Sequence, residues 1–288
     1  MPLTPGLLYL MASVTCSVTV AVLLKLARRH GVDVRQAFAA NYAIASLLAW
    51  LTLVPQPVQA LGAITAWPLL MALAVLLPTV FMAMAQSVRH AGIVRSDAAQ
   101  RLSLFIPLLA AFALFGEELT GRKLGAIALA FAALALVLRR PRADATDPDA
   151  TRGAWLWPLG VWLGYGVIDV LFKQLARTGT AFAGALLAVF IMAGVLTALY
   201  LVARRVQWQG RSLAAGLLLG LFNFGNILTY IKAHQSLPGN PALVFASMNM
   251  GVIALGTVVG ALIFKERLSA LNLFGLLLAF GAIFAMMP

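Results

Sequence analysis

The sequence FGEELT at residues 115–120 recurs as FKERLS at residues 264–269, 149 positions further along the chain. Two shorter matches have nearly the same offset: Gln86-Ser87 with Gln235-Ser236, and Leu24-Lys25 with Phe172-Lys173. Three separated matches at almost one offset indicate that the chain consists of two copies of one unit.

The composition is that of a membrane protein. Of the 288 residues, 62% are hydrophobic and only 10% are charged, and the mean hydropathy is +0.95. A soluble globular domain carries roughly 25% charged residues. In a bilayer, apolar side chains can face lipid while the backbone polar groups are paired within helices. We therefore expect an all-α integral membrane protein, and the single Cys16 excludes an internal disulfide.

A bilayer crossing needs about 20 predominantly apolar residues, and ten windows meet this requirement. They lie near residues 7–27, 37–54, 67–88, 93–115, 122–138, 155–175, 181–203, 213–234, 241–264 and 270–287. The first window is interpreted as a span rather than a signal peptide, because no basic residue precedes it.

The predicted fold has ten transmembrane helices in two five-helix repeats. Residues 1–140 form the first repeat, residues 141–153 a polar linker, and residues 154–288 the second repeat. Because five is an odd number, the two copies cross the membrane in opposite senses. Such inverted repeats usually provide alternating access to a site between the two halves.

The paired motif resembles the EamA-type signature of the drug/metabolite transporter superfamily. It follows the fourth span as FGEELT and the ninth as FKERLS, and the resemblance covers essentially the whole chain. The first copy departs slightly, since Glu117 is one residue closer to Gly125 than Glu266 is to Gly275. The resemblance implies a carrier of small metabolites, uncoupled or proton-coupled, that uses no ATP. It does not fix a substrate.

Within the motif, Glu117 and Glu266 each follow a span and precede a Thr or Ser by three residues. A carboxylate there can cap the following helix and interact favourably with its positive N-terminal end. We expect both to be structural turn residues.

The net charge of +12 gives two conflicting expectations about orientation. The odd-numbered loops hold thirteen Lys and Arg residues and the even-numbered loops three. The positive-inside rule therefore predicts that both termini lie outside, whereas the family resemblance implies termini inside. Because the basic residues are spread between spans, they do not indicate nucleic-acid binding.

Ionisable groups within spans are costly and mark functional sites by default. The sequence places them in two clusters, one near each mouth: Lys25, Asp97 and Arg101, and Asp169, Lys173 and His234. The candidates for coupling or gating are Lys25, Asp97 and Lys173, and those for proton coupling are His234, Asp97 and Asp169. Alternatively, the lysines snorkel to the interface, and Asp97 pairs with Arg101 one turn on.

Polar side chains also form helical stripes that lipid would not tolerate. Span six has polar residues at steps of four, and span eight at steps of three and four. We predict that these residues and polar groups from spans two, three, four and nine line a substrate cavity: Asn41, Tyr42, Gln86, Arg101, Tyr165, Asp169, Asn223, Asn226, Tyr230, His234 and Asn249. Hydrogen bonds between helices are the alternative role for the amides and tyrosines.

The expected function is a secondary active transporter that exports or exchanges a small polar metabolite, such as an amino acid or organic anion. The alternative is proton-coupled efflux of drugs or amines. An enzyme is not expected, because HExxH, GxSxG and P-loop motifs are absent from the sequence. We expect no cofactor or metal. The expected partners are a small-molecule substrate, the lipid bilayer and protons, and the expected location is the inner membrane of a bacterium.

Overall fold

The computed structural model describes residues 5–54, 56, 60–61, 65–115, 120–139, 148–179, 181–237 and 241–285. Its helices are α1 (Pro5–Arg29), α2 (Val34–Thr52), α4 (Trp67–Ala91), α5 (Ile93–Leu102), α6 (Phe105–Phe115), α7 (Gly121–Leu138), α8 (Pro148–Arg177), α9 (Phe182–Ala203), α10 (Gly210–Ser236), α11 (Pro241–Val258) and α12 (Ala270–Ala285). A short π-helical segment, η2 (Val259–Ile263), continues α11. The described residues contain no β-strand, so the all-α prediction is confirmed for them.

Seven helices in the described part of the chain are long and apolar enough to cross a membrane. They are α1, α4, α7, α8, α9, α10 and α11, the last together with η2. Their outer faces carry large apolar side chains, as in Leu199 and Leu262, which are 59% and 74% exposed. The chain thus has the character of a multi-pass membrane protein, and α2, α12 and the α5–α6 pair fall outside this group of seven.

The expected fourth span is not one helix. The structure ends α5 at Leu102 and begins α6 at Phe105, so the window at 93–115 is divided. Proline accounts for the break: Pro107 has no N–H to donate to Ser103, and its ring would clash with the carbonyl of that residue. The Ser103 carbonyl instead accepts a hydrogen bond from the Ile106 amide at 2.9 Å, and the Ser103 hydroxyl donates to the Gln100 carbonyl at 2.6 Å. The break places Ser103, which is 2% exposed, beside the polar residues at the end of α5.

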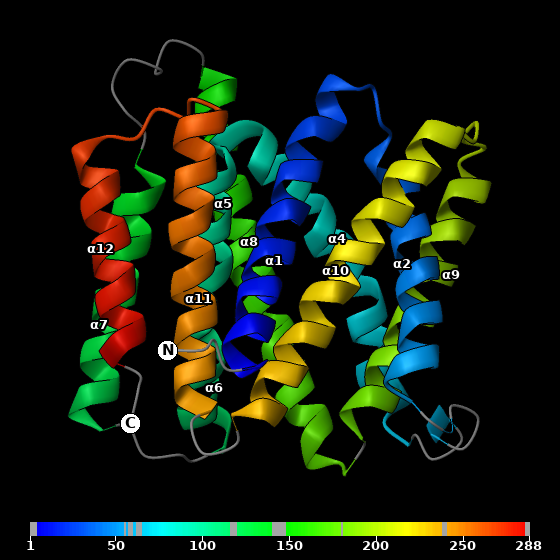
Figure 1. Ribbon diagram of the computed structural model, residues 1–288, viewed down its shortest axis with the longest axis horizontal. Helices are drawn as coiled ribbons and strands as arrows, with labels where there is room; N and C mark the ends of the chain where they lie inside the picture. The colour runs from blue at the N-terminus through cyan, green and yellow to red at the C-terminus, as the bar shows by residue number, and fades with distance from the viewer. Residues whose placement is uncertain are drawn as a thin grey trace.

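Helices run in alternating directions through the bundle, with α5 and α6 together making one passage in the same direction (Figure 1). We call the end at which α1 begins and α12 ends the lower end, after its place in Figure 1, and the opposite end the upper end. The connections α1–α2, α4–α5, α9–α10 and α11–α12 lie at the upper end. They include most of the described basic residues that lie between spans, so the charge bias noted in the sequence falls on one face of the molecule.

Helices from the two halves of the chain interlock. The α10 helix packs against both α1 and α2, and α4 packs against both α8 and α9. The α2 helix also contacts α9, and α7 contacts α12. The largest buried cluster combines side chains from α1, α2, α4, α8 and α9, and the second combines α5, α6 and α7 with α11 and α12. Neither half has a core of its own.

Glycines allow the closest of these helix crossings. A Cβ on Gly216 would strike the Ala37 carbonyl oxygen of α2, and one on Gly220 would lie 2.7 Å from the Asn41 carbonyl oxygen. This Gly-xxx-Gly step lets the backbones of α2 and α10 touch. The step formed by Gly256 and Gly260 similarly faces Asp97 and Val94 of α5.

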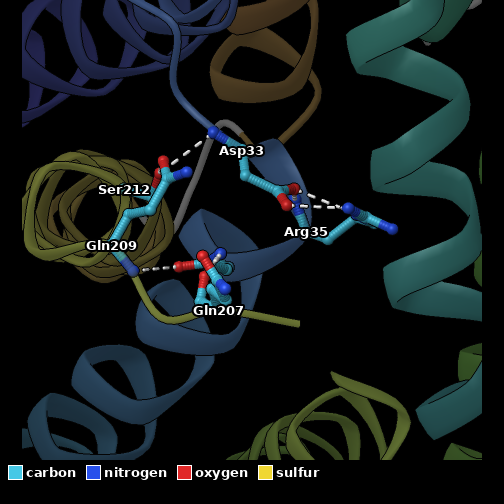
Figure 2. A network of polar contacts seen from close by, with 6 residues as sticks. Asp33, Arg35, Gln207, Gln209 and Ser212 are labelled. Carbon is cyan, nitrogen blue, oxygen red and sulfur yellow. Dashed lines mark hydrogen bonds and ion pairs between the residues drawn. The ribbon is translucent and has the colours of Figure 1, made fainter. Parts of the chain in front are cut away.

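A network of hydrogen bonds connects the start of α2 to the start of α10 at the upper end (Figure 2). The Asp33 amide donates to the Ser212 hydroxyl at 2.9 Å, and the Gln209 amide donates to the Gln36 side chain at 2.8 Å. The Arg35 guanidinium donates two hydrogen bonds to the Asp33 carboxylate, at 3.0 and 2.8 Å. These bonds lower the pKa of the Asp33 carboxyl, so its stabilising contribution is present above the ordinary aspartate range and is lost as the pH falls through that lowered pKa.

Two expectations fall partly or wholly outside the described residues. Glu117 lies outside them, so its expected role as a turn residue stays a prediction. The expected linker at 141–153 is described only from Pro148, and from there the chain already forms the first turns of α8.

Candidate functional site

A cavity of about 490 Å³ lies between α5, α8, α10 and α11. It extends to the lower end, where α9 and α11 begin and α10 ends. Seven of the residues expected at the substrate site line it: Arg101, Tyr165, Asp169, Asn226, Tyr230, His234 and Asn249. The lining therefore combines a cation, a carboxylate, two phenols, two amides and an imidazole in one chamber. Such a set can bind a solute that carries both charged and hydrogen-bonding groups.

Arg101 is the cation of the cavity, and it sits one residue before the end of α5. Its Nη2 donates to the Ser17 hydroxyl of α1 at 2.6 Å. Its Nε is buried and has no hydrogen-bond partner among the described residues. Arg101 forms no ion pair in the described part of the chain, although Asp97 and Asp169 lie within electrostatic range. A buried guanidinium with an unpaired N–H group can donate hydrogen bonds to a carboxylate or phosphate ligand.

Asp97 lies one turn before Arg101 on α5 and deeper in the protein. It is 2% exposed, and its Oδ2 accepts no hydrogen bond from the described residues. With Ser17, Ala21 and Asn223 it lines a small cavity of about 30 Å³. This small cavity shares Gln100, Tyr165 and Asn226 with the large one, so the polar chamber continues inward past Arg101.

The polar stripe of α10 is fixed by its neighbours. Asn226 accepts a hydrogen bond at 2.8 Å from the Ser13 hydroxyl of α1. The rings of Tyr230 and His234 meet edge to face, with 4.7 Å between their centroids. On the facing helix α11, Asn249 donates to the Phe245 carbonyl at 2.9 Å.

The structure distributes the charged residues differently from the two clusters expected. Arg101 shares the cavity with Asp169 and His234, because α5 carries it from the upper end toward the middle of the bundle. Lys25 remains at the upper end, where its Nζ lies 2.6 Å from the Glu266 carboxylate. Lys173, one turn beyond Asp169, is not among the residues that line the cavity.

Three expected cavity residues lie elsewhere. Asn41 and Tyr42 are fully buried in α2, where Asn41 accepts a hydrogen bond from Asn223 at 3.3 Å. Tyr42 packs its ring against Phe81 and Phe190 instead of facing a chamber. Gln86 lines a separate pocket of about 230 Å³ with Val34 and Arg89. A polar residue in a membrane helix can serve a helix interface as well as a cavity, and spacing along one helix cannot separate the two roles.

Comparisons with known proteins give a relative and a fold. An uncharacterized protein of Haemophilus influenzae is 46% identical over 282 residues, which cover 96% of each chain. The chain belongs to that protein's family. No family model matches the sequence. A crystal structure of another protein superposes with a TM-score of 0.64, covering 97% of this chain and 95% of its own. At 18% identity, that likeness shows the fold alone.

The cavity of this family member includes residues that sequence reasoning missed. Gln100, Ser103 and Gln235 contribute polar groups, and Phe182 and Met248 contribute apolar ones. The proximity of Gln100 and Ser103 to Arg101, together with the nearby proline, was a usable signal. The aromatic and sulfur side chains carried none, because such residues are ordinary in membrane helices. Among the described residues, no group of three or more His, Cys, Asp or Glu side chains could hold a metal ion.

Proposed function

We propose that the protein is a secondary active transporter that moves a small polar metabolite by alternating access. The observation that carries the proposal is the polar cavity at the α5–α6 break, open at the lower end and lined by Arg101 and Asp169. Discontinuous helices near the middle of the membrane are the usual substrate sites of secondary transporters. Ionisable groups such as Arg101 and Asp169 are costly inside a membrane and usually mark a functional site.

The architecture we propose is ten crossings in two inverted repeats. On this reading α1, α2, α4, α5–α6 and α7 correspond in order to α8, α9, α10, α11 and α12. The contacts support the correspondence: α1 packs on α10 as α8 packs on α4, and α2 packs on α10 as α9 packs on α4. Equivalent helices α2 and α9 also touch, as do α7 and α12. A two-fold axis in the membrane plane would produce this set of contacts.

We further assign the protein to the EamA-type drug/metabolite transporters of a bacterial inner membrane. The repeated FGEELT and FKERLS motifs and the two-half arrangement favour this assignment. The substrate class that fits the lining is an amino acid or an organic anion. Arg101 offers free donors to a carboxylate, while Asp169 and the aromatic rings of Tyr165 and Tyr230 can accept an ammonium group.

Ligand-induced stabilisation tests the proposal. The detergent-purified protein is melted with amino acids, organic anions, sugars, nucleosides and amines in turn. We expect a rise in melting temperature with a carboxylate-bearing class, because a ligand that binds only the folded state stabilises it. Lack of stabilisation by any class would contradict the substrate cavity. Uptake of the stabilising compound into proteoliposomes then tests transport itself.

The second candidate function is proton-coupled efflux of drugs or amines. It is favoured by Asp97, a buried acid with an oxygen that accepts no hydrogen bond among the described residues. Acids in this position are the usual proton carriers of membrane transporters. A pH gradient across the same proteoliposomes separates the candidates, since only the coupled carrier accumulates a permanently charged quaternary amine above the level found in protein-free liposomes.

A further inference from the structure

The Glu266 carboxylate is held at the upper end by three hydrogen bonds. One carboxylate oxygen accepts a hydrogen bond from Lys25 Nζ at 2.6 Å and one from the Ile93 amide at 2.7 Å. The other accepts from the Val94 amide at 3.1 Å. The two amides are the first of helix α5, so the carboxylate also meets the positive end of that helix. One side chain thereby connects α1, the start of α5 and the α11–α12 connection.

The surrounding backbone is shaped around this carboxylate. Gly92 has φ +90°, and a Cβ there would lie 2.6 Å from the Glu266 carboxylate. Lys265 takes φ +53°, a left-handed conformation that is uncommon for a residue other than glycine. The Glu266 amide donates to the Gly260 carbonyl at 2.9 Å. The connection is therefore bent so that Glu266 points back into the bundle and not toward α12.

This finding corrects the role expected for Glu266. It caps α5 and not the helix that follows it in sequence. The start of α12 is instead served by Asn272, whose side chain accepts from the Ser269 amide at 3.0 Å. Glu266 therefore does not cap α12, and its carboxylate instead connects helices that are distant in sequence.

The Lys25–Glu266 pair also lies beyond the small inner cavity, toward the upper end. Ala21 is 1% exposed, lines the small cavity beside Asp97, and stands one turn before Lys25 on α1. The large cavity is open at the lower end, the small one continues inward, and the Lys25–Glu266 pair stands between Ala21 and the upper end. Leu24 and Ile93, which are next to the pair in the chain or bonded to it, are buried as well.

We propose that Glu266 is the latch that closes the substrate path at the upper end, an inference that rests on the proposed transport function. Opening this end requires Glu266 to leave Lys25 and the start of α5. Glu266 can leave these partners because water reaches the pair: the Lys25 and Glu266 side chains are 21% and 10% exposed. Water can then replace the contacts, so their net strength is modest. At a fully buried apolar contact, water could not replace the lost interactions in this way.

Thiol accessibility tests the latch without any substrate. The one native thiol is removed by Cys16→Ala, and Ala21→Cys places a probe behind the latch. A membrane-impermeant thiol reagent is applied to right-side-out and inverted vesicles. In this background, Glu266→Gln and Lys25→Gln should each raise labelling from the side of the upper end about tenfold to hundredfold, the range set by losing a hydrogen bond to a charged group.

Lys25→Gln keeps Glu266 on the start of α5, so it remains informative if Glu266→Gln does not fold. The matched control is Arg35→Gln, which breaks the Arg35–Asp33 ion pair at the same end but off the path. Labelling that rises in both latch variants and not in the control supports the proposal. Unchanged labelling in the latch variants overturns it, as does an equal rise in the control, which would indicate general loosening. If no solute stabilises the protein, the transport proposal fails while the labelling result still decides the latch.

Discussion

At the scale of single residues, Arg101 is the side chain on which the candidate site depends most. Ser17 satisfies one of its nitrogens, and Nε has no partner in the described structure. A charged group inside a membrane protein is tolerated when water or a ligand completes its bonds. The cavity beside it provides room for both.

We expect Arg101→Gln to weaken binding of a carboxylate ligand by about tenfold to hundredfold, since hydrogen bonds to charged groups contribute about 1.5–3 kcal/mol. Arg101→Lys should fall between this variant and the wild type, because it keeps the charge but loses the planar fork. Ligand-dependent melting of purified protein measures both. Arg204→Gln removes an exposed arginine and is the control. Equal affinity in Arg101→Gln and the control would exclude Arg101 from the site.

At the scale of helices, the crossing of α2 and α10 is set by two glycines. A side chain on Gly220 would meet the Asn41 backbone, which cannot move aside as a flexible side chain can. By contrast, Gly160 of α8 has open space where a Cβ would be, with nothing within 4 Å. Two glycines in helices of the same protein therefore differ in whether a larger residue fits.

Gly220→Val should destabilise the protein by about 1–3 kcal/mol, the usual cost of forcing extra atoms into packed helices. Gly160→Val should have little effect or a small stabilising one, since valine is the better helix former. The melting temperatures of the two purified variants give the comparison. Similar values for both would mean that α2 and α10 do not pack as closely as described.

The sequence predicted helices better than it predicted their contacts. Apolar windows located the helices because lipid imposes its requirement locally, on each crossing. The break after Leu102 was missed because residues 93–115 together have the length of one crossing, although the first part is polar and the second contains Pro107. The contact between Glu266 and Ile93 could not be predicted from the sequence, because it joins residues 173 positions apart. Asn41 and Asn226 are equally polar, and only the packing of α10 decides which one faces the cavity.

At the scale of the whole molecule, one end is basic and carries the Lys25–Glu266 pair, while the other holds the cavity mouth. The described basic residues that lie between spans fall mostly in the connections of the upper end, where the latch also lies. The thirteen Lys and Arg residues of the odd-numbered loops, against three in the even-numbered ones, favour a cytoplasmic upper end. The chain begins and ends its described helices at the opposite face.

We accordingly expect a reporter fused to the C-terminus to lie outside the cytoplasm. An alkaline phosphatase fusion should be active, and a fusion to a fluorescent protein that matures only in the cytoplasm should be dark. Fusions placed after Arg205, in the connection between α9 and α10, should give the reverse pattern and serve as the control. A bright C-terminal fluorescent fusion would reverse the orientation and place the cavity mouth in the cytoplasm.

The close approach of Gly225 to Cys16 also makes the protein convenient for spectroscopy. The half-buried thiol lies 3.4 Å from where a Cβ on Gly225 would be, at the crossing of the helix that carries Lys25 with the helix that lines the cavity. It is also the only thiol in the chain. A small fluorinated tag on this native atom would give one resonance per arrangement of the two helices. The relative areas of its lines would report populations, and their widths the rate of exchange, in an otherwise unmodified protein.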